Sequence, residues 1–242
     1  VYKAGILKGK QLQQVEVAVK NLPPQIEKDS IKDFLNTLSY PLYFLDFETF
    51  NPAIPLYDNS SPFQQIVFQY SLHYQESEKG ELKHTECLSY PEKDPRREIA
   101  ERLCKDIPKN ACVTAYNMGF EKGIIRGLAS LYPDLAEHLM HIHENIKDIM
   151  IPFQKRYYYT KEMQGSYSIK YVLPALFPNE PSLNYAHLEG VHNGGAASST
   201  FLAMQKMKDS EREIWRKRLL AYCKLDTYAM VKVLDKLKEV ID

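Results

Sequence analysis

The alternation of apolar and polar positions predicts a set of strands in the first half of the chain. Residues 42–47 are apolar on both faces, the pattern of a strand covered on both sides within a mixed or parallel sheet. Residues 64–75 and 81–90 alternate in polarity and are joined by a short polar turn, so they predict an antiparallel hairpin. Residues 111–116 predict a further short, buried strand.

Helical spacing of apolar residues predicts helices around and after these strands. The segments with this spacing are 94–107, 117–135, 169–178, 190–207 and 210–241, and further helices are expected to fill 134–157. Residues 156–168 predict a polar and aromatic loop. The order of the elements predicts an α/β fold, with a mixed sheet of about five strands flanked by helices.

The length of 242 residues suits one domain with a substantial core. We expect this domain to span 35–242, after a lead-in segment or linker over 1–34 that contains Asn-Leu-Pro-Pro. The chain begins with Val1 rather than Met, which suggests the hypothesis that it is a fragment of a longer protein.

Charge and cysteine content narrow the class of protein. Lys+Arg and Asp+Glu both number 31, so there is no global basic field and any nucleic-acid contact must be local. The four cysteines are scattered without a Cys-x-x-Cys pair, and they predict reduced thiols in a cytoplasmic protein. The sequence has neither a run of about 18 apolar residues nor the apolar core of a signal peptide, so no membrane partner is expected.

Two carboxylates, Asp46 and Glu48, stand at the end of the apolar strand. Side chains two residues apart in a strand point to the same side, so these acids are expected to lie side by side. Two adjacent carboxylates repel, and burying them without a partner is costly, so a positive charge is expected between them. Taken alone, the pair also fits a strand end with solvated acids.

Two further acids stand where a core or a ligand site is expected. Asp226 interrupts an apolar stripe of the last helix and shares a helix face with Tyr222, four positions earlier. Glu121 follows the strand 111–116 at the start of a helix, where α/β proteins place their ligands. Acids that converge from separate elements supply oxygen ligands to hard divalent cations. The four acids therefore predict a centre of two Mg²⁺ or Mn²⁺ ions that can activate water and bind a phosphodiester.

With these motifs, the chain resembles the DEDD (DnaQ-like) 3′→5′ exonuclease superfamily, which has a ribonuclease H-like fold. The matching segments are LDFET (45–49), YNMGFE (116–121) and YCKLD (222–226), and the Tyr-x-x-x-Asp form of the last is typical of the tyrosine subclass. Residues 35–240 also resemble a bacterial domain of unknown function that is often joined to an N-terminal RecB-like nuclease domain.

The resemblance implies a role for each matching residue. Asp46, Glu48, Glu121 and Asp226 would be catalytic and ligate the two ions, and Tyr222 would orient the attacking water. The second motif of the superfamily ends in Asp, whereas this chain has Glu121, whose longer side chain would shift the second ion. Asp148 is a further candidate acid in case Glu121 does not take that place.

The substrate implied by the resemblance is DNA or RNA with a single-stranded 3′ end. Candidate substrate-binding residues lie beside the motifs and in the basic, tyrosine-rich segment that follows residue 154: Thr49, Phe50, Asn117, Lys155, Arg156 and Tyr158. A packed aromatic loop with a solvated basic edge explains that segment equally well. Gly194 and Gly195 permit close approach of the backbone to a substrate, or they simply form a turn.

Two functions compete on this basis. The first is a metal-dependent 3′→5′ exonuclease that hydrolyses phosphodiester bonds by a two-metal mechanism. The alternative is a catalytically inactive nucleic-acid-binding or protein-binding module of a larger nuclease, which Glu121 in place of Asp favours. The seven histidines are better explained as surface or structural residues, because no His-x-x-x-His pair stands beside a matching acid.

Overall fold

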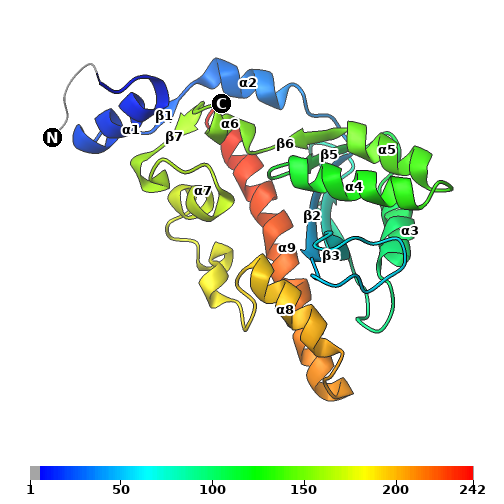
Figure 1. Ribbon diagram of the computed structural model, residues 1–242. Helices are drawn as coiled ribbons and strands as arrows, with labels where there is room; N and C mark the ends of the chain where they lie inside the picture. The colour runs from blue at the N-terminus through cyan, green and yellow to red at the C-terminus, as the bar shows by residue number, and fades with distance from the viewer. Residues whose placement is uncertain (1–5, 242) are drawn as a thin grey trace.

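A five-stranded mixed sheet forms the centre of the protein in the computed structural model, which describes residues 6–241 (Figure 1). Its strands, in spatial order, are β4 (Lys83–Leu88), β3 (Ile66–Gln75), β2 (Leu42–Phe50), β5 (Cys112–Ala115) and β6 (Ile146–Asp148). Strand β3 runs antiparallel to both β4 and β2, whereas β5 and β6 run parallel to β2. This is the mixed sheet of about five strands that the sequence predicts for a ribonuclease H-like fold.

Helices cover both faces of the sheet, as the α/β prediction requires. Side chains alternate along β2, so that Tyr43, Leu45 and Phe47 join one core cluster and Phe44 joins another. The first cluster lies under α3 (Arg96–Asp106), α4 (Gly119–Leu131) and α5 (Ala136–Glu144). The opposite face is crossed by the long α9 (Asp209–Glu239), with α7 (Ile169–Leu176) and α8 (Gly194–Met204) beside it (Figure 1).

Most of the predicted elements are confirmed, including the 66–88 hairpin and the helices after it. The expectation that helices fill 134–157 is wrong in its middle, where β6 adds an edge strand before the short α6 (Ile151–Gln154). Three residues are too few to show a periodicity of two. Pairing with β5, more than thirty residues earlier in the chain, creates this strand, and local sequence cannot reveal it.

The segment before residue 35 packs against the rest of the chain. It forms α1 (Gly9–Val19), β1 (Gln25–Ile26) and α2 (Lys28–Leu35), and β1 pairs with β7 (Tyr158–Tyr159). Val17 and Ile31 are fully buried in the cluster that includes α9. The described residues also form three short 3₁₀ helices: η1 (Lys161–Met163), η2 (Pro181–Leu183) and η3 (Tyr185–His187).

No helix among residues 6–241 combines the length and apolar character needed to span a membrane. The four cysteines are free thiols in the structure.

Candidate metal centre

Three carboxylates from two elements meet at the carboxyl end of β2. Each of Asp46, Glu48 and Asp226 has a carboxylate oxygen within 4.8 Å of the other two. Asp46 and Glu48 lie on the face of β2 that α9 crosses, and Asp226 comes from the middle of α9. The register between β2 and β3 shifts between Glu48 and Thr49, and such an irregularity re-aims side chains at the end of a strand. The predicted convergence of these three acids is therefore present.

Glu121 belongs to the same cleft but not to the group of three. It lies in the first turn of α4, only 2% of its surface is exposed, and its Oε2 has no hydrogen-bond partner in the described part of the chain. A buried carboxylate oxygen without a partner costs free energy, so it calls for a cation or a proton.

The electrostatics of the cleft agree with this geometry. Burial, followed by repulsion from Asp226 and Glu48, raises the pKa of Asp46 well above its usual range. Burial is also the main cause that raises the pKa of Glu48 to about 8, of Glu121 to about 8 and of Asp226 to about 7. Within residues 6–241, no lysine, arginine or histidine forms an ion pair with any of these four acids. No direct ion pair therefore compensates the charge of these acids.

Asp148, the further candidate acid, is occupied elsewhere. Its carboxylate accepts hydrogen bonds from the backbone amides of Asn117 (3.0 Å), Met118 (3.1 Å) and Met150 (2.9 Å). It does not line the acid cleft, and Asn117 beside it has the left-handed φ of 76°. Asp148 thus fixes the turn between β5 and α4 that places Glu121, and the structure does not support a role as a ligand.

Two tyrosines flank Asp226, and sequence reasoning found only one of them. Tyr222, one turn earlier on α9, is buried and lines the cleft, as expected from its shared helix face. Tyr185 in η3 donates a hydrogen bond of 2.6 Å from its hydroxyl to Oδ1 of Asp226, and its ring lies 6.0 Å from the Tyr222 ring. No local motif marks Tyr185, because it reaches Asp226 only through the tertiary fold.

The acids line a cleft of about 630 Å³ together with residues from other segments of the chain. Two of the predicted substrate-binding residues, Thr49 and Asn117, lie in it. An additional cation, the exposed Lys170 of α7, also lines the cleft and favours the charged forms of Glu48 and Asp226. The start of α8 completes the wall with Gly194, Gly195, Ser198 and Ser199.

The structure does not bring the other four predicted substrate-binding residues to this cleft. Phe50 is 1% exposed and packs against Phe68 and Phe201 in the core. Tyr158 is 5% exposed in β7, and the Arg156 guanidinium stacks 4.0 Å from the Tyr159 ring. Lys155 follows the last residue of α6 and does not line the cleft. The tyrosine-rich segment is therefore largely a packed aromatic region, since its apolar rings are buried against β1 and the core.

Comparisons with known proteins give a family but no activity. The sequence model of the family described as "Domain of unknown function (DUF2779)" matches residues 43–168, and the chain belongs to this family. An uncharacterized protein of Ureaplasma parvum is 27% identical over 92% of this chain and 35% of its own length. An uncharacterized protein of Mycoplasma genitalium is 23% identical over 88% of the chain and 34% of its own length. The chain thus spans about a third of the length of these relatives, and no solved structure matches it significantly.

Proposed function

We propose that this member of the DUF2779 family is a divalent-metal-dependent 3′→5′ exonuclease that hydrolyses phosphodiester bonds of DNA or RNA. The observation that carries the proposal is the convergence of Asp46, Glu48 and Asp226, whose carboxylate oxygens lie within 4.8 Å of one another. The resemblance to the tyrosine subclass of DEDD exonucleases supplies the direction of cleavage, and the mixed sheet agrees with the fold of that superfamily.

The residues of the cleft fit two hard cations. Three half-buried or buried carboxylates without a cationic partner, and the orphaned Oε2 of Glu121, form an all-oxygen donor set. Asp46, Glu48, Asp226 and Glu121 would hold Mg²⁺ or Mn²⁺. Bound there, the ions supply Lewis-acid activation of water and charge stabilisation for the phosphodiester.

The side chains of the chain have separate tasks in this proposal. The Tyr222 hydroxyl would orient the attacking water, because Tyr222 is held on α9 one turn before Asp226. Tyr185 holds Asp226 in place through its 2.6 Å hydrogen bond to Oδ1 of that carboxylate. Lys170 lies on the rim of the same cleft, where its ammonium would meet the phosphate backbone of the substrate.

A cleavage assay with defined ends tests the proposal. Single-stranded DNA and RNA labelled at the 5′ end are incubated with the protein and Mn²⁺, and a circular single strand serves as the matched control. We expect stepwise shortening of both linear strands and an intact circle, with no shortening by Asp46→Ala. If wild type cleaves neither strand and Asp46→Ala binds nucleic acid as well as wild type, the chain is a binding module instead.

A further inference from the structure

The amino-terminal end of α8 reaches the wall of the cleft that carries the acids. A Cβ atom added to Gly194 would lie only 3.5 Å from Oε2 of Glu48. Gly195, Ser198 and Ser199 line the same cleft on the first two turns of this 11-residue helix. The backbone at the helix start is thus close to Glu48, with no side chain between them.

Two amides at this helix end have no hydrogen-bond partner in the described chain. The Asn193 side chain accepts from the Ala196 amide at 2.9 Å, and the Asn193 carbonyl accepts from the Ala197 amide at 3.0 Å. Neither interaction uses the amides of Gly194 or Gly195. The first amides of a helix have no partner within it, and together they act as roughly half a positive charge. This end of the helix therefore attracts an anion.

An independent feature of the same cleft also calls for a ligand. Only 2% of the Glu121 surface is exposed, and its Oε2 has no hydrogen-bond partner in the described residues. This carboxylate calls for a cation or a proton, whereas the α8 end attracts an anion, and both line one cleft. An anionic group that is itself bound to divalent cations satisfies both requirements.

We propose that the α8 amino terminus, through the Gly194 and Gly195 amides, is the phosphate-binding element of the site. It holds the phosphate of a nucleotide against cations carried by the acid wall. Glycine is required there because a side chain would keep the phosphate oxygens away from the amides. The identification of the anion as a phosphate ester rests on the proposed nuclease function. In this proposal Gly194 and Gly195 bind phosphate and do not merely form a turn.

A change of charge at Gly195 tests the element. Gly195→Asp adds a carboxylate to the first turn, where acids stabilise helices, and its Cβ atom lies 3.2 Å from Oδ1 of Asn193, so a thermal melt checks that the variant folds. The matched control, Ser210→Asp, adds the same charge to the first turn of α9 outside the cleft. A second variant, Gly194→Ala, adds a methyl group that makes only an ordinary 3.5 Å contact with Glu48.

The probes are thymidine 5′-monophosphate and thymidine, each titrated calorimetrically in the presence of Mn²⁺, with Mn²⁺ alone titrated separately. We expect Gly195→Asp to weaken binding of the monophosphate about tenfold, the scale of a charge at a helix end in a favourable site. Gly194→Ala should weaken it less, and Ser210→Asp should not change it. Binding of Mn²⁺ alone should be retained in all three variants.

Several results would overturn the inference. They are equal binding of thymidine and its monophosphate by wild type, unchanged binding of the monophosphate by both glycine variants, or loss of Mn²⁺ affinity in Gly195→Asp. The cleavage assay separates this failure from failure of the proposed function. If wild type cleaves nucleic acid and the glycine variants bind the monophosphate as well as wild type does, only the assignment of the α8 end as a phosphate-binding element is wrong. If the glycine variants lose monophosphate binding but wild type does not cleave nucleic acid, only the proposed nuclease activity is wrong.

Discussion

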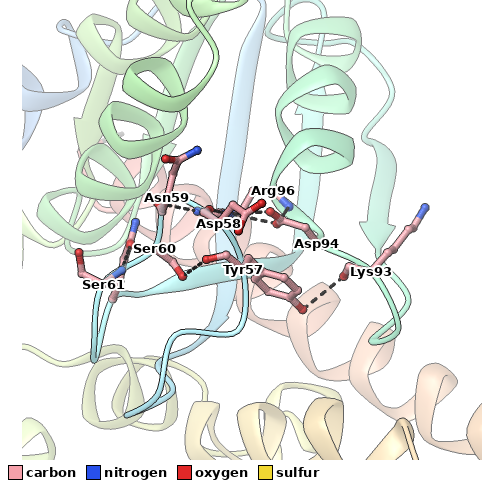
Figure 2. A network of polar contacts seen from close by, with 9 residues as sticks. Tyr57, Asp58, Asn59, Ser60, Ser61, Lys93, Asp94 and Arg96 are labelled. Atoms are coloured by element: carbon pink, nitrogen blue, oxygen red, sulfur yellow. Dashed lines mark hydrogen bonds and ion pairs between the residues drawn. The ribbon is translucent and has the colours of Figure 1, made fainter.

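The acid cleft and the loop between β2 and β3 both remove charged side chains from water, but they satisfy them differently. Arg96 at the start of α3 is 4% exposed. Its guanidinium donates to the Asp94 carboxylate, to the Asp58 carbonyl at 2.7 Å and to the Asn59 carbonyl at 3.2 Å (Figure 2). In the cleft, by contrast, four carboxylates line one cavity and none of them forms an ion pair within the described residues.

The buried charge of Arg96 has a structural role, whereas the buried acids of the cleft have a functional one in our proposal. Around Arg96, the hydrogen bonds to the Asp58 and Asn59 carbonyls fix the loop, and Figure 2 shows the Tyr57 hydroxyl donating to the Lys93 carbonyl beside Asp94. A paired charge of this kind contributes to one folded arrangement. Unpaired acids cost stability and are tolerated where a ligand completes them. Removing a charge should therefore have opposite consequences in the two regions.

The largest effect is expected from Asp226→Asn. Asparagine keeps the acceptor for Tyr185 but removes a carboxylate ligand, so Mn²⁺ binding should weaken and cleavage should fall by more than about 10³-fold. The metal-free variant should unfold at the same temperature as wild type or higher, because repulsion of Asp46 and Glu48 decreases. Cleavage assays, Mn²⁺ calorimetry and thermal melts measure these quantities, with the exposed Asp235→Asn of the same helix as control. Wild-type cleavage by Asp226→Asn would contradict the assignment of the site.

The pH dependence of stability should also set the cleft apart. Glu48 and Glu121 have pKa values raised to about 8 and Asp226 to about 7, so the folded state holds these protons more tightly than the unfolded chain. Their contribution to stability is complete below the unfolded pKa, near 4, and is lost as the pH rises through 7–8. Without metal, the free energy of unfolding should fall by at least about 3 kcal/mol between pH 5 and pH 8, because each such group contributes up to about 1.4 kcal/mol per pH unit.

Denaturant unfolding at several pH values, with and without Mn²⁺, measures this slope. Mn²⁺ should reverse the loss, because metal binding needs deprotonated carboxylates and so strengthens as the pH rises. Glu48→Gln should flatten the slope of the metal-free protein. A metal-free stability that rises steadily from pH 5 to pH 8 would show that these acids ionise freely and are solvated.

Removing Arg96 should damage stability and leave the metal centre intact. Arg96→Met leaves the Asp58 and Asn59 carbonyls and the Asp94 carboxylate without their donor, so the free energy of unfolding should fall by about 3 kcal/mol. The neighbouring Arg97 makes ion pairs of 2.7 Å with Glu101 and Asp134 but is 44% exposed. Arg97→Met should therefore leave the free energy of unfolding almost unchanged. Equal losses in denaturant unfolding of the two variants would remove the contrast between buried and exposed pairs.

The two regions also differ in how far the sequence predicts them. Asp46 and Glu48 could be placed because a strand of period two fixes neighbouring side chains locally, and Asp226 because helix period aligns it with Tyr222. The Arg96 network could not be predicted, since its partners are loop carbonyls 37 and 38 residues away. The strand β6 was missed for the same reason: pairing with β5 defines it.

Local composition gave a wrong prediction for the segment around Arg156, because composition does not show which side chains are buried. The basic and tyrosine-rich segment around Arg156 has the composition of a nucleic-acid surface, but β1 pairs with β7 and buries Tyr158 and Tyr159. Lys170, fourteen residues after Arg156, is the cation that lines the cleft, because α7 carries it there. The types of residue in the sequence predicted the chemistry of the site. Tertiary contacts decided which individual acids, tyrosines and lysines reach it.

The smallest effects should come from the two tyrosines beside Asp226, and they should differ in kind. Tyr222→Phe keeps the ring but loses the hydroxyl proposed to orient water, so cleavage should slow by about 10²-fold while Mn²⁺ binding persists. Tyr185→Phe loses the 2.6 Å hydrogen bond to Asp226, so Mn²⁺ affinity should fall about tenfold, the lower range for a residue that orients a metal ligand. Calorimetry and cleavage rates at saturating Mn²⁺ distinguish the two.

A double-mutant cycle shows whether Tyr185 acts through Asp226. In an Asp226→Ala background the hydroxyl has no carboxylate to hold, so adding Tyr185→Phe should not weaken residual Mn²⁺ binding further. Tyr116→Phe is the matched control, since that hydroxyl donates to the Tyr167 carbonyl and not to an acid of the cleft. Additive losses in the cycle would show that the Tyr185 hydroxyl acts on the site by a route other than its hydrogen bond to Asp226. Unchanged cleavage by Tyr222→Phe would leave Tyr185 as the tyrosine closest to the chemistry, because its hydroxyl contacts the carboxylate of Asp226 directly.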